Sequence, residues 1–243
     1  MKRQLLILAA AGMLSANAAA QSQGDWIFRA GLGSVMPNTS SNNLVFEGIE
    51  LEGYQIDVRD NIRPVFNLTW MATNNLGVEV LAAWPFKHNI RGDDALRGLG
   101  KLGDTRHLPP VVSLQYHFLP GERFRPYAGL GLNYTYFFDE STTPALHEGI
   151  IATSNAALGT SYSGGDTSMN IKNSLGLALQ VGADIQLNDT LFLNFDLRWI
   201  DIDADARLTT RTIDALGNDI TLRSRVKADI DPWVFSTTIG FRF

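Results

Sequence analysis

Apolar and polar residues alternate along eight segments of the chain, which is the pattern of β-strands with one apolar face. The apolar residues take the even positions in five segments and the odd positions in the last three. The five even segments are 26–36, 64–72, 76–86, 108–118 and 126–138, and the three odd ones are 175–187, 191–199 and 233–243. We therefore predict eight strands over these ranges.

The two faces of these strands differ sharply in charge. The apolar sets hold 48 positions and no charged residue. The interleaved positions hold eight charges: Arg29, Arg63, Glu79, Arg125, Asp184, Asp196, Arg198 and Arg242. An Arg or Lys on a lipid-facing strand position costs about 2–4 kcal/mol at mid-bilayer. The face without charged residues is therefore predicted to contact lipid. The strands of a soluble β-sandwich would alternate as well, with their apolar face inward.

Two features favour a membrane barrel over a sandwich. All five tryptophans lie in the apolar sets near strand ends, where outer-membrane barrels carry aromatic girdles: Trp26, Trp70, Trp84, Trp199 and Trp233. The interleaved face is rich in glycine, and small residues mixed with charges suit a narrow, side-chain-filled interior. We predict an all-β fold, an eight-stranded antiparallel transmembrane β-barrel with long extracellular loops and short periplasmic turns.

The connections between the predicted strands alternate in length, and this sets the orientation. Residues 73–75, 119–123 and 188–190 are short links, whereas the segments after positions 36, 86, 138 and 203 are long. Outer-membrane barrels place short turns in the periplasm and long loops outside. Both termini are then periplasmic. The segment 139–173, rich in Ser, Thr, Gly and Ala, is expected to be a mobile loop.

The N-terminus has the three parts of a secretory signal peptide. Lys2 and Arg3 are basic, residues 5–14 are mainly apolar, and residues 18–20 are all alanine. We predict cleavage after Ala20, so that residues 1–20 are a signal peptide and residues 21–243 a single barrel domain in the cell outer membrane. The alternative, a membrane anchor, needs about 20 apolar residues, more than this run supplies.

Composition removes several other classes of protein. The mean hydropathy of −0.03 does not contradict a membrane protein, because alternating barrel strands average near zero. The chain has no cysteine, so disulfides do not stabilise it. A formal charge of −5 with both signs mixed gives no reason to expect nucleic-acid binding. We expect a monomer, because a closed sheet leaves no edge to pair.

Several stretches resemble one family of small outer-membrane barrels. They are Met71–Val80, the His107-Leu-Pro-Pro110 segment, Phe124–Phe138, Trp199–Asp203, Asp231–Phe235 and the C-terminal Phe241-Arg-Phe243. In combination they closely resemble the OmpW family over nearly the whole chain beyond the signal peptide. The segments 139–173 and 203–229 are longer than is usual in that family.

The resemblance implies an eight-stranded barrel with a narrow hydrophobic channel. It also implies passive passage of small hydrophobic solutes across the outer membrane, and some members serve as receptors for bacteriocins or phage. The terminal aromatic residue resembles the signal read by the barrel-assembly machinery, which would be a partner during biogenesis.

The predicted inward-facing residues can be sorted by height in the barrel. The outer half is apolar and gives our candidate ligand-binding residues: Val65, Leu81, Ala83, Val111, Phe137, Ile200 and Val234. The periplasmic half is charged and gives a candidate plug: Arg29, Glu79, Arg125, Asp184, Asp196, Arg198 and Arg242. We expect these charges to pair, because lone charges in a packed interior are costly.

This arrangement predicts an outer-membrane channel with an apolar upper lumen and a charged lower plug. A solute would leave sideways near Pro64, Pro85 and Pro109, which lack a ladder donor. A fully packed upper lumen without a cavity is the alternative for the structure. The alternative for function is a structural or receptor-type protein that acts through its extracellular loops.

We predict no catalytic residue, metal site or cofactor. Histidines at 88, 107 and 147 invite an enzyme interpretation, but no nucleophile motif accompanies them. The stretch Asp201–Asp205 resembles the start of a calcium loop, yet Ala206 and Thr212 stand where such loops need Gly and Glu. The basic loop 87–106 is a candidate contact with lipopolysaccharide. We therefore expect lipopolysaccharide and the outer-membrane lipids as further partners.

Overall fold

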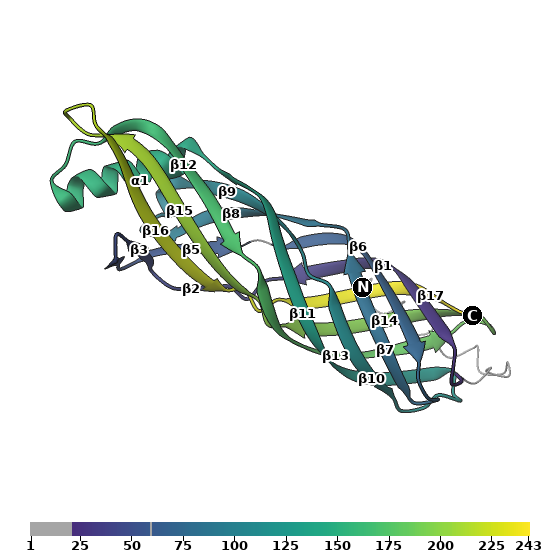
Figure 1. Ribbon diagram of the computed structural model, residues 1–243. Helices are drawn as coiled ribbons and strands as arrows, with labels where there is room; N and C mark the ends of the chain where they lie inside the picture. Colours follow the sequence, from purple (N-terminus) through teal and green to yellow (C-terminus); the bar gives the residue numbers. More distant parts are fainter. Residues whose placement is uncertain (1–20, 59) are drawn as a thin grey trace, which may run out of the picture.

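The computed structural model describes residues 21–58 and 60–243. The molecule is long and narrow, with a barrel at one end and a stranded extension at the other (Figure 1). The predicted signal peptide and its cleavage site after Ala20 precede the described residues and remain a prediction. The start of the described chain lies beside its end, since the backbone N–H of Trp26 donates to the carbonyl of Phe243 at 2.8 Å.

Eight antiparallel strands close into the predicted barrel. Their bounds are β1 (Trp26–Met36), β6 (Asn61–Met71), β7 (Leu76–Ala83), β10 (Val111–His117), β11 (Phe124–Thr142), β13 (Ser174–Gln186), β14 (Leu191–Ile200) and β17 (Trp233–Arg242). Each strand pairs with the next in this order, and β17 returns to pair with β1. The predicted strands are confirmed to within a few residues at each end.

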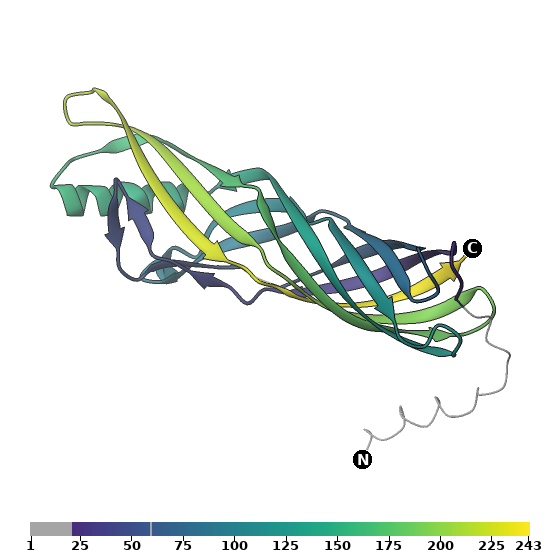
Figure 2. The ribbon, with the colours of Figure 1, turned by 60° about the horizontal axis from the view of Figure 1, so that its bottom comes forward.

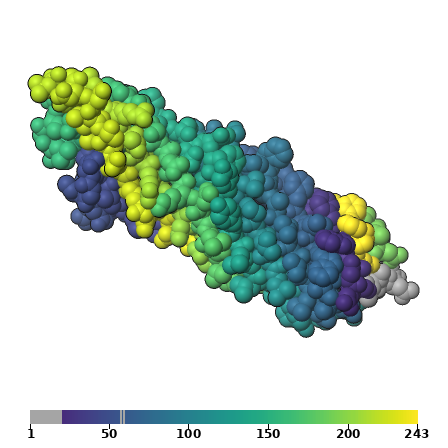
Figure 3. Space-filling model, in the orientation of Figure 1, coloured from purple at the N-terminus to yellow at the C-terminus, as the bar shows by residue number. Residues whose placement is uncertain are grey.

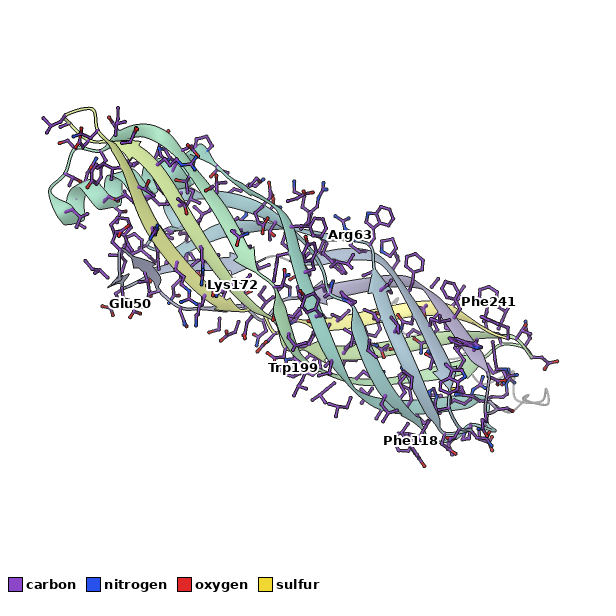
Figure 4. All side chains as sticks on the ribbon, in the orientation of Figure 1. Glu50, Arg63, Phe118, Lys172, Trp199 and Phe241 are labelled. Atoms are coloured by element: carbon purple, nitrogen blue, oxygen red, sulfur yellow. The ribbon has the colours of Figure 1, made fainter. Side chains whose placement is uncertain are left out.

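The outward face of the barrel is the apolar belt that the alternation predicts. Trp26 lies opposite Trp70 near the end with the short turns, and Trp199 lies opposite Trp233 near the other end. Figure 4 shows Phe118, Trp199 and Phe241 projecting from the outer surface. Beyond Trp199 the outward positions become charged, as with Arg106, which pairs with Asp139 at 2.8 Å in solvent. The membrane-spanning part therefore ends near the level of Trp199 and Trp233.

Phe86 is the one exception among the 48 positions that we assigned to the lipid face. Its side chain is only 2% exposed and points inward. The ladder of β7 ends at Ala83, and the next strand, β8 (Phe86–Asp94), begins after Trp84 and Pro85. Both Ala83 and Phe86 point inward, so this break shifts the alternation by one residue. The lipid-facing assignment of Phe86 was wrong.

The long connections build a stranded extension of the barrel rather than free loops. On one side β5 (Tyr54–Val58), β8 and β9 (Lys101–Leu108) continue the barrel sheet next to the outer half of β11. On the other side a second sheet contains β12 (Ser163–Lys172), β15 (Asp203–Ile213), β16 (Asp219–Asp229), β3 (Leu44–Phe46), β4 (Ile49–Leu51) and the short β2 (Ser40–Ser41). In Figure 3 the β15–β16 hairpin reaches the far end of the extension.

The helix α1 (Pro144–Leu158) lies at the end of the extension farthest from the C-terminus (Figure 2). The Thr143 hydroxyl accepts a hydrogen bond from the Leu146 N–H, Pro144 takes the first turn, and Gly159 ends the helix in a left-handed conformation. The segment 139–173, expected to be a mobile loop, therefore consists of the end of β11, α1 and β12. Within the described residues, neither α1 nor the short η2 (Arg97–Leu99) is long and apolar enough to cross a membrane.

Candidate functional site

One continuous apolar core runs from the upper lumen of the barrel to α1. In the barrel it contains Val65, Leu81 and Ile200, and in the extension it contains Phe86, Ile90, Leu146 and others. The inward positions of β8, β9, β15 and β16 face one another across the extension, with their charged neighbours pointing to solvent. The apolar lumen thus continues well beyond the membrane.

Three cavities lie along this core. The outer cavity, under α1, is lined by residues that include Leu44, Phe46, Leu99, Leu146, Ile150 and Leu208. The middle cavity is lined by residues that include Val35, His88, Thr105, His107, Phe137 and Ile230. The inner cavity lies inside the barrel and is lined by residues that include Val65, Leu81, Ala83, Phe86, Ile200 and Val234.

The three cavities adjoin one another and form an apolar track. Ile56, Ile90 and Ala206 line both the outer and the middle cavity. Val35, His107, Ile202 and Pro232 line both the middle and the inner cavity. The outer, middle and inner cavities have volumes of about 50, 40 and 20 Å³. The cavity volume falls toward the membrane, and all three volumes are small, so side chains must move for a solute to pass.

The seven residues proposed for the upper lumen all point inward and are at most 7% exposed. Val65, Leu81, Ala83, Ile200 and Val234 line the inner cavity. Phe137 lines the middle cavity instead, on the outer half of β11. Val111 is fully buried but lines none of the three. The inward position of these residues fits a lumen, whereas a binding role for them remains a prediction.

The floor of the inner cavity is Arg198, which belongs to a network of buried charges. Arg198 Nη2 donates to Glu79 Oε1 at 2.7 Å, and Arg198 Nε lies 3.4 Å from Asp196. Arg29 donates to both carboxylate oxygens of Asp184, at 2.7 and 3.1 Å, and lies 3.4 Å from Glu79. All five side chains are at most 1% exposed, so the expected pairing of buried charges is present for them.

Neutral hydrogen-bonding groups tie this network across the barrel. The Tyr127 hydroxyl donates to Asp196 at 2.9 Å, and Asn194 Nδ2 donates to Asp184 at 2.8 Å. Thr69 accepts from Arg29 at 2.9 Å. The participants come from β1, β6, β7, β11, β13 and β14, so the network spans the lumen. Below it Ile27, Met71 and Phe192 form a second buried apolar cluster.

Two members of the predicted plug lie outside this network. Arg242 is at the periplasmic rim, where it donates to the Asp189 carbonyl at 2.8 Å and lies 3.8 Å from Asp25. Arg125 is 3% exposed and makes no ion pair within 4 Å among the described residues. Its guanidinium lies 5.9 Å from the ring centre of Phe192, in cation–π geometry. Strand parity placed both residues inward but did not predict their partners.

The backbone hydrogen-bond ladder of the barrel wall is interrupted beside the inner cavity. The ladder between β7 and β10 ends at Leu81 and Val111, and the next pairing on the same side joins Phe86 of β8 to His107 of β9. Pro109 and Pro110 occupy the break, where they have no N–H to donate. Pro109 and Ala83 both line the inner cavity. The interruption is therefore where our sequence analysis placed a sideways exit.

The outer and middle cavities were not predicted, because we treated the extracellular segments as loops. A signal was present in 203–213 and 219–229, where apolar residues such as Leu208, Leu222 and Val226 alternate with charges. Our sequence analysis considered His88 and His107 only for an enzyme interpretation, whereas they lie inside the track, 3% and 6% exposed. Among the described residues no group of three or more His, Cys, Asp or Glu could hold a metal ion.

Comparison with known proteins gives consistent matches over nearly the whole chain. The sequence model of the OmpW family matches residues 22–243. Outer membrane protein W of Vibrio cholerae is 38% identical over 98% of this chain and 97% of that protein. The crystal structure of the outer membrane protein OprG from Pseudomonas aeruginosa is similar with a TM-score of 0.74 at 33% identity, over 92% of this chain and 98% of OprG.

A more distant relative has a name that refers to metabolism. It is the dibenzothiophene metabolism operon protein PahQ of Pseudomonas aeruginosa, 26% identical over 90% of this chain and 88% of that protein.

Proposed function

The chain belongs to the OmpW family and is an outer-membrane β-barrel, and on this basis we propose that it is a channel for passive passage of small hydrophobic molecules. The observation that carries the proposal is the run of three adjoining apolar cavities from α1 to Arg198. An apolar pocket with few polar groups suits a small hydrophobic ligand. The name of PahQ, which links a relative to the metabolism of an aromatic sulfur heterocycle, agrees with this class of solute.

The route begins in the extension. An apolar interior there would let a hydrophobic solute cross the polar layer outside the membrane without entering water. It would move through the outer and middle cavities and reach the inner cavity at the level of Leu81 and Val234.

The charged network then ends the axial path. Moving a hydrophobic solute through it would separate Arg198 from Glu79 with no replacement partner, which is costly for buried charges. The interruption at Pro109 offers a path into the lipid instead, where the solute is soluble. The channel therefore delivers its solute to the membrane and leaves the network closed to ions.

The proposal is tested by solute entry into vesicles that contain lipopolysaccharide, which slows unaided entry of hydrophobic molecules. Protein without residues 1–20 is reconstituted, and entry of radiolabelled naphthalene is compared with protein-free vesicles. Leu81→Asp and Phe137→Asp each place a charge in the track and should abolish the protein-dependent entry. Leu81→Met, which keeps an apolar side chain of similar volume, should retain it.

Folding of each variant is checked by heat-modifiable gel migration. If folded wild-type protein does not speed naphthalene entry, or if folded Leu81→Asp and Phe137→Asp leave it unchanged, the channel proposal is wrong.

A further inference from the structure

Aromatic rings line one side of the middle cavity and continue into the inner cavity, which Phe86 lines. Phe86 and His88 on β8 and His107 on β9 present nearly parallel rings, with centroids 5.5 Å apart for Phe86 and His107 and 4.9 Å apart for the two histidines. The interplanar angles are 22° and 15°. The Phe137 ring on β11 lies 5.7 Å from His107, tilted by 48°. Three neighbouring strands therefore build one continuous aromatic surface.

The facing wall is aliphatic and comes from other elements. It includes Val35 of β1, Ile202 and Ile230 from the segments that flank β15 and β16, and Pro232. A cavity with an aromatic surface on one side and branched aliphatic groups on the other suits a flat ring. Aromatic rings gain from stacked or tilted neighbours beyond the area that they bury, whereas a saturated chain has no such gain.

The polar side chains that line the middle cavity lie on the same aromatic side. They are His88, Thr105 and His107. Thr105 donates to the Arg106 carbonyl at 3.3 Å. The His107 side chain is 6% exposed and makes no hydrogen bond to any residue that the structure describes. A neutral imidazole has one N–H donor and one acceptor nitrogen, and leaving them unsatisfied in an apolar interior is unfavourable.

His107 also lies where a moving solute must pass. It is shared by the middle and the inner cavity, next to the break at Pro109. Burial, together with the neighbouring His88, lowers the pKa of His107 to about 3. The ring is thus neutral at neutral pH and offers hydrogen bonds without a charge that would repel an apolar solute.

From these observations we propose that His107, supported by the stacked His88, makes the channel selective for small planar aromatic molecules that carry a hydroxyl or similar hydrogen-bonding group, over hydrocarbons of the same shape. The inference rests on the proposed channel and names its preferred class of solute. His107 is a specificity-determining residue in this role, because its ring nitrogen satisfies the solute's polar group while the neighbouring Phe137 ring contacts the face of the solute.

The test measures binding of two matched probes, radiolabelled 2-naphthol and naphthalene, to the protein in lipid nanodiscs by equilibrium dialysis against empty nanodiscs. His107→Phe keeps an aromatic ring and removes the hydrogen bond. It should weaken 2-naphthol binding two- to tenfold, the range expected for one neutral hydrogen bond, and change naphthalene binding less than twofold. His147→Phe is the matched control, because His147 lies on α1 outside all three cavity linings, and it should change neither.

The outcomes separate the two proposals. If neither probe binds above empty nanodiscs, the channel proposal fails. If both probes bind and His107→Phe affects them equally or not at all, only the selectivity is overturned. Should His107→Phe not fold, ¹⁵N spectra of the wild-type imidazole rings give the answer. Addition of 2-naphthol should change the ¹⁵N chemical shifts of the His107 ring, whereas naphthalene should leave them unchanged. Equal changes with both probes would overturn the inference.

Discussion

Arg198 and Glu79 lie 119 residues apart in the sequence and meet inside the barrel, with Arg198 Nη2 2.7 Å from Glu79 Oε1. Glu79 also lies 3.4 Å from Arg29, so one carboxylate serves two guanidinium groups. None of the three side chains is exposed. These charges, which end the axial path of the proposed channel, therefore also connect β1, β7 and β14 across the barrel.

Removing Glu79 should destabilise the barrel strongly. In Glu79→Ala both arginines lose a partner at a fully buried site, and breaking a buried pair in this way costs about 3–5 kcal/mol. The free energy of unfolding, measured by urea titration with heat-modifiable gel migration, should fall accordingly. Arg97→Ala is the control: Arg97 is 76% exposed and paired with Asp93 in solvent, so its loss should leave the free energy of unfolding nearly unchanged. Equal losses in the two variants would contradict a bracing role for the network.

The sequence predicted the barrel, and which of its side chains point inward, for a local physical reason. In a strand that crosses lipid, each position faces either lipid or lumen, and the cost of a charge in lipid decides which. Parity alone therefore placed Leu81 and Arg198 inside. Height along the strand then separated the apolar lumen from the charged half.

The odd or even position of a residue along its strand cannot predict features that depend on how distant segments of the chain meet. The partners of Arg29, 50 and 155 residues away, follow from the stagger of the closed barrel. The inward position of Phe86 follows from the break in the strand at Trp84 and Pro85, and the alternation of apolar and polar residues does not predict that break. The cavities of the extension require that β8 and β15 face each other, and outside the membrane an alternating segment is equally compatible with a solvated hairpin.

Gly240 should tolerate no side chain, because Phe192 fills the space beside it. A methyl group on Gly240 would lie 2.1 Å from Phe192 Cε2, in the apolar cluster below the charged network. Gly240→Ala should therefore cost about 1–3 kcal/mol, the usual range for overpacking. Adding Phe192→Leu should recover part of that loss, since the double variant removes the clashing ring.

Urea midpoints of the two single variants and the double variant measure this coupling. Gly98→Ala is the control, since a methyl group there meets nothing within 4 Å and the backbone is not left-handed. Fully additive effects of Gly240→Ala and Phe192→Leu would show that the ring is not the obstacle.

Filling the inner cavity should block transport without unfolding the barrel. Ala83 is 7% exposed and lines this cavity beside Pro109, so the larger ring of Ala83→Phe would occupy the space that precedes the proposed exit. The rate of naphthalene entry into vesicles containing lipopolysaccharide should fall at least fivefold. This corresponds to a rise of about 1 kcal/mol or more in the free-energy barrier to entry.

Ala82→Phe is a matched control for this prediction. Ala82 is the preceding residue on the same strand and points outward, where an added aromatic ring meets lipid. Its entry rate should equal that of the wild type. Loss of entry in both variants would point to a general effect on β7, and unchanged entry in Ala83→Phe would exclude the inner cavity from the route.

Acid should weaken the extension through His107. Because burial and His88 hold its pKa at about 3, against 6.5 for an exposed histidine, the unfolded chain binds a proton between these values that the folded chain does not. Stability therefore rises with pH across this window and falls on acidification from pH 6.5 toward 3. The largest slope that one such group contributes is about 1.4 kcal/mol per pH unit.

His107→Phe has no proton to take up, so the free energy of unfolding of the wild type should decline relative to that of the variant as the pH drops from 7.5 to 4.5. Carboxylates titrate in both proteins and cancel in the difference, and His147→Phe, which leaves His107 in place, should follow the wild type. Free energies of unfolding that change with pH in the same way in the wild type and in His107→Phe would contradict this prediction. They would mean that His107 takes up its proton in the folded protein, so that the track holds a charge where the middle and inner cavities meet.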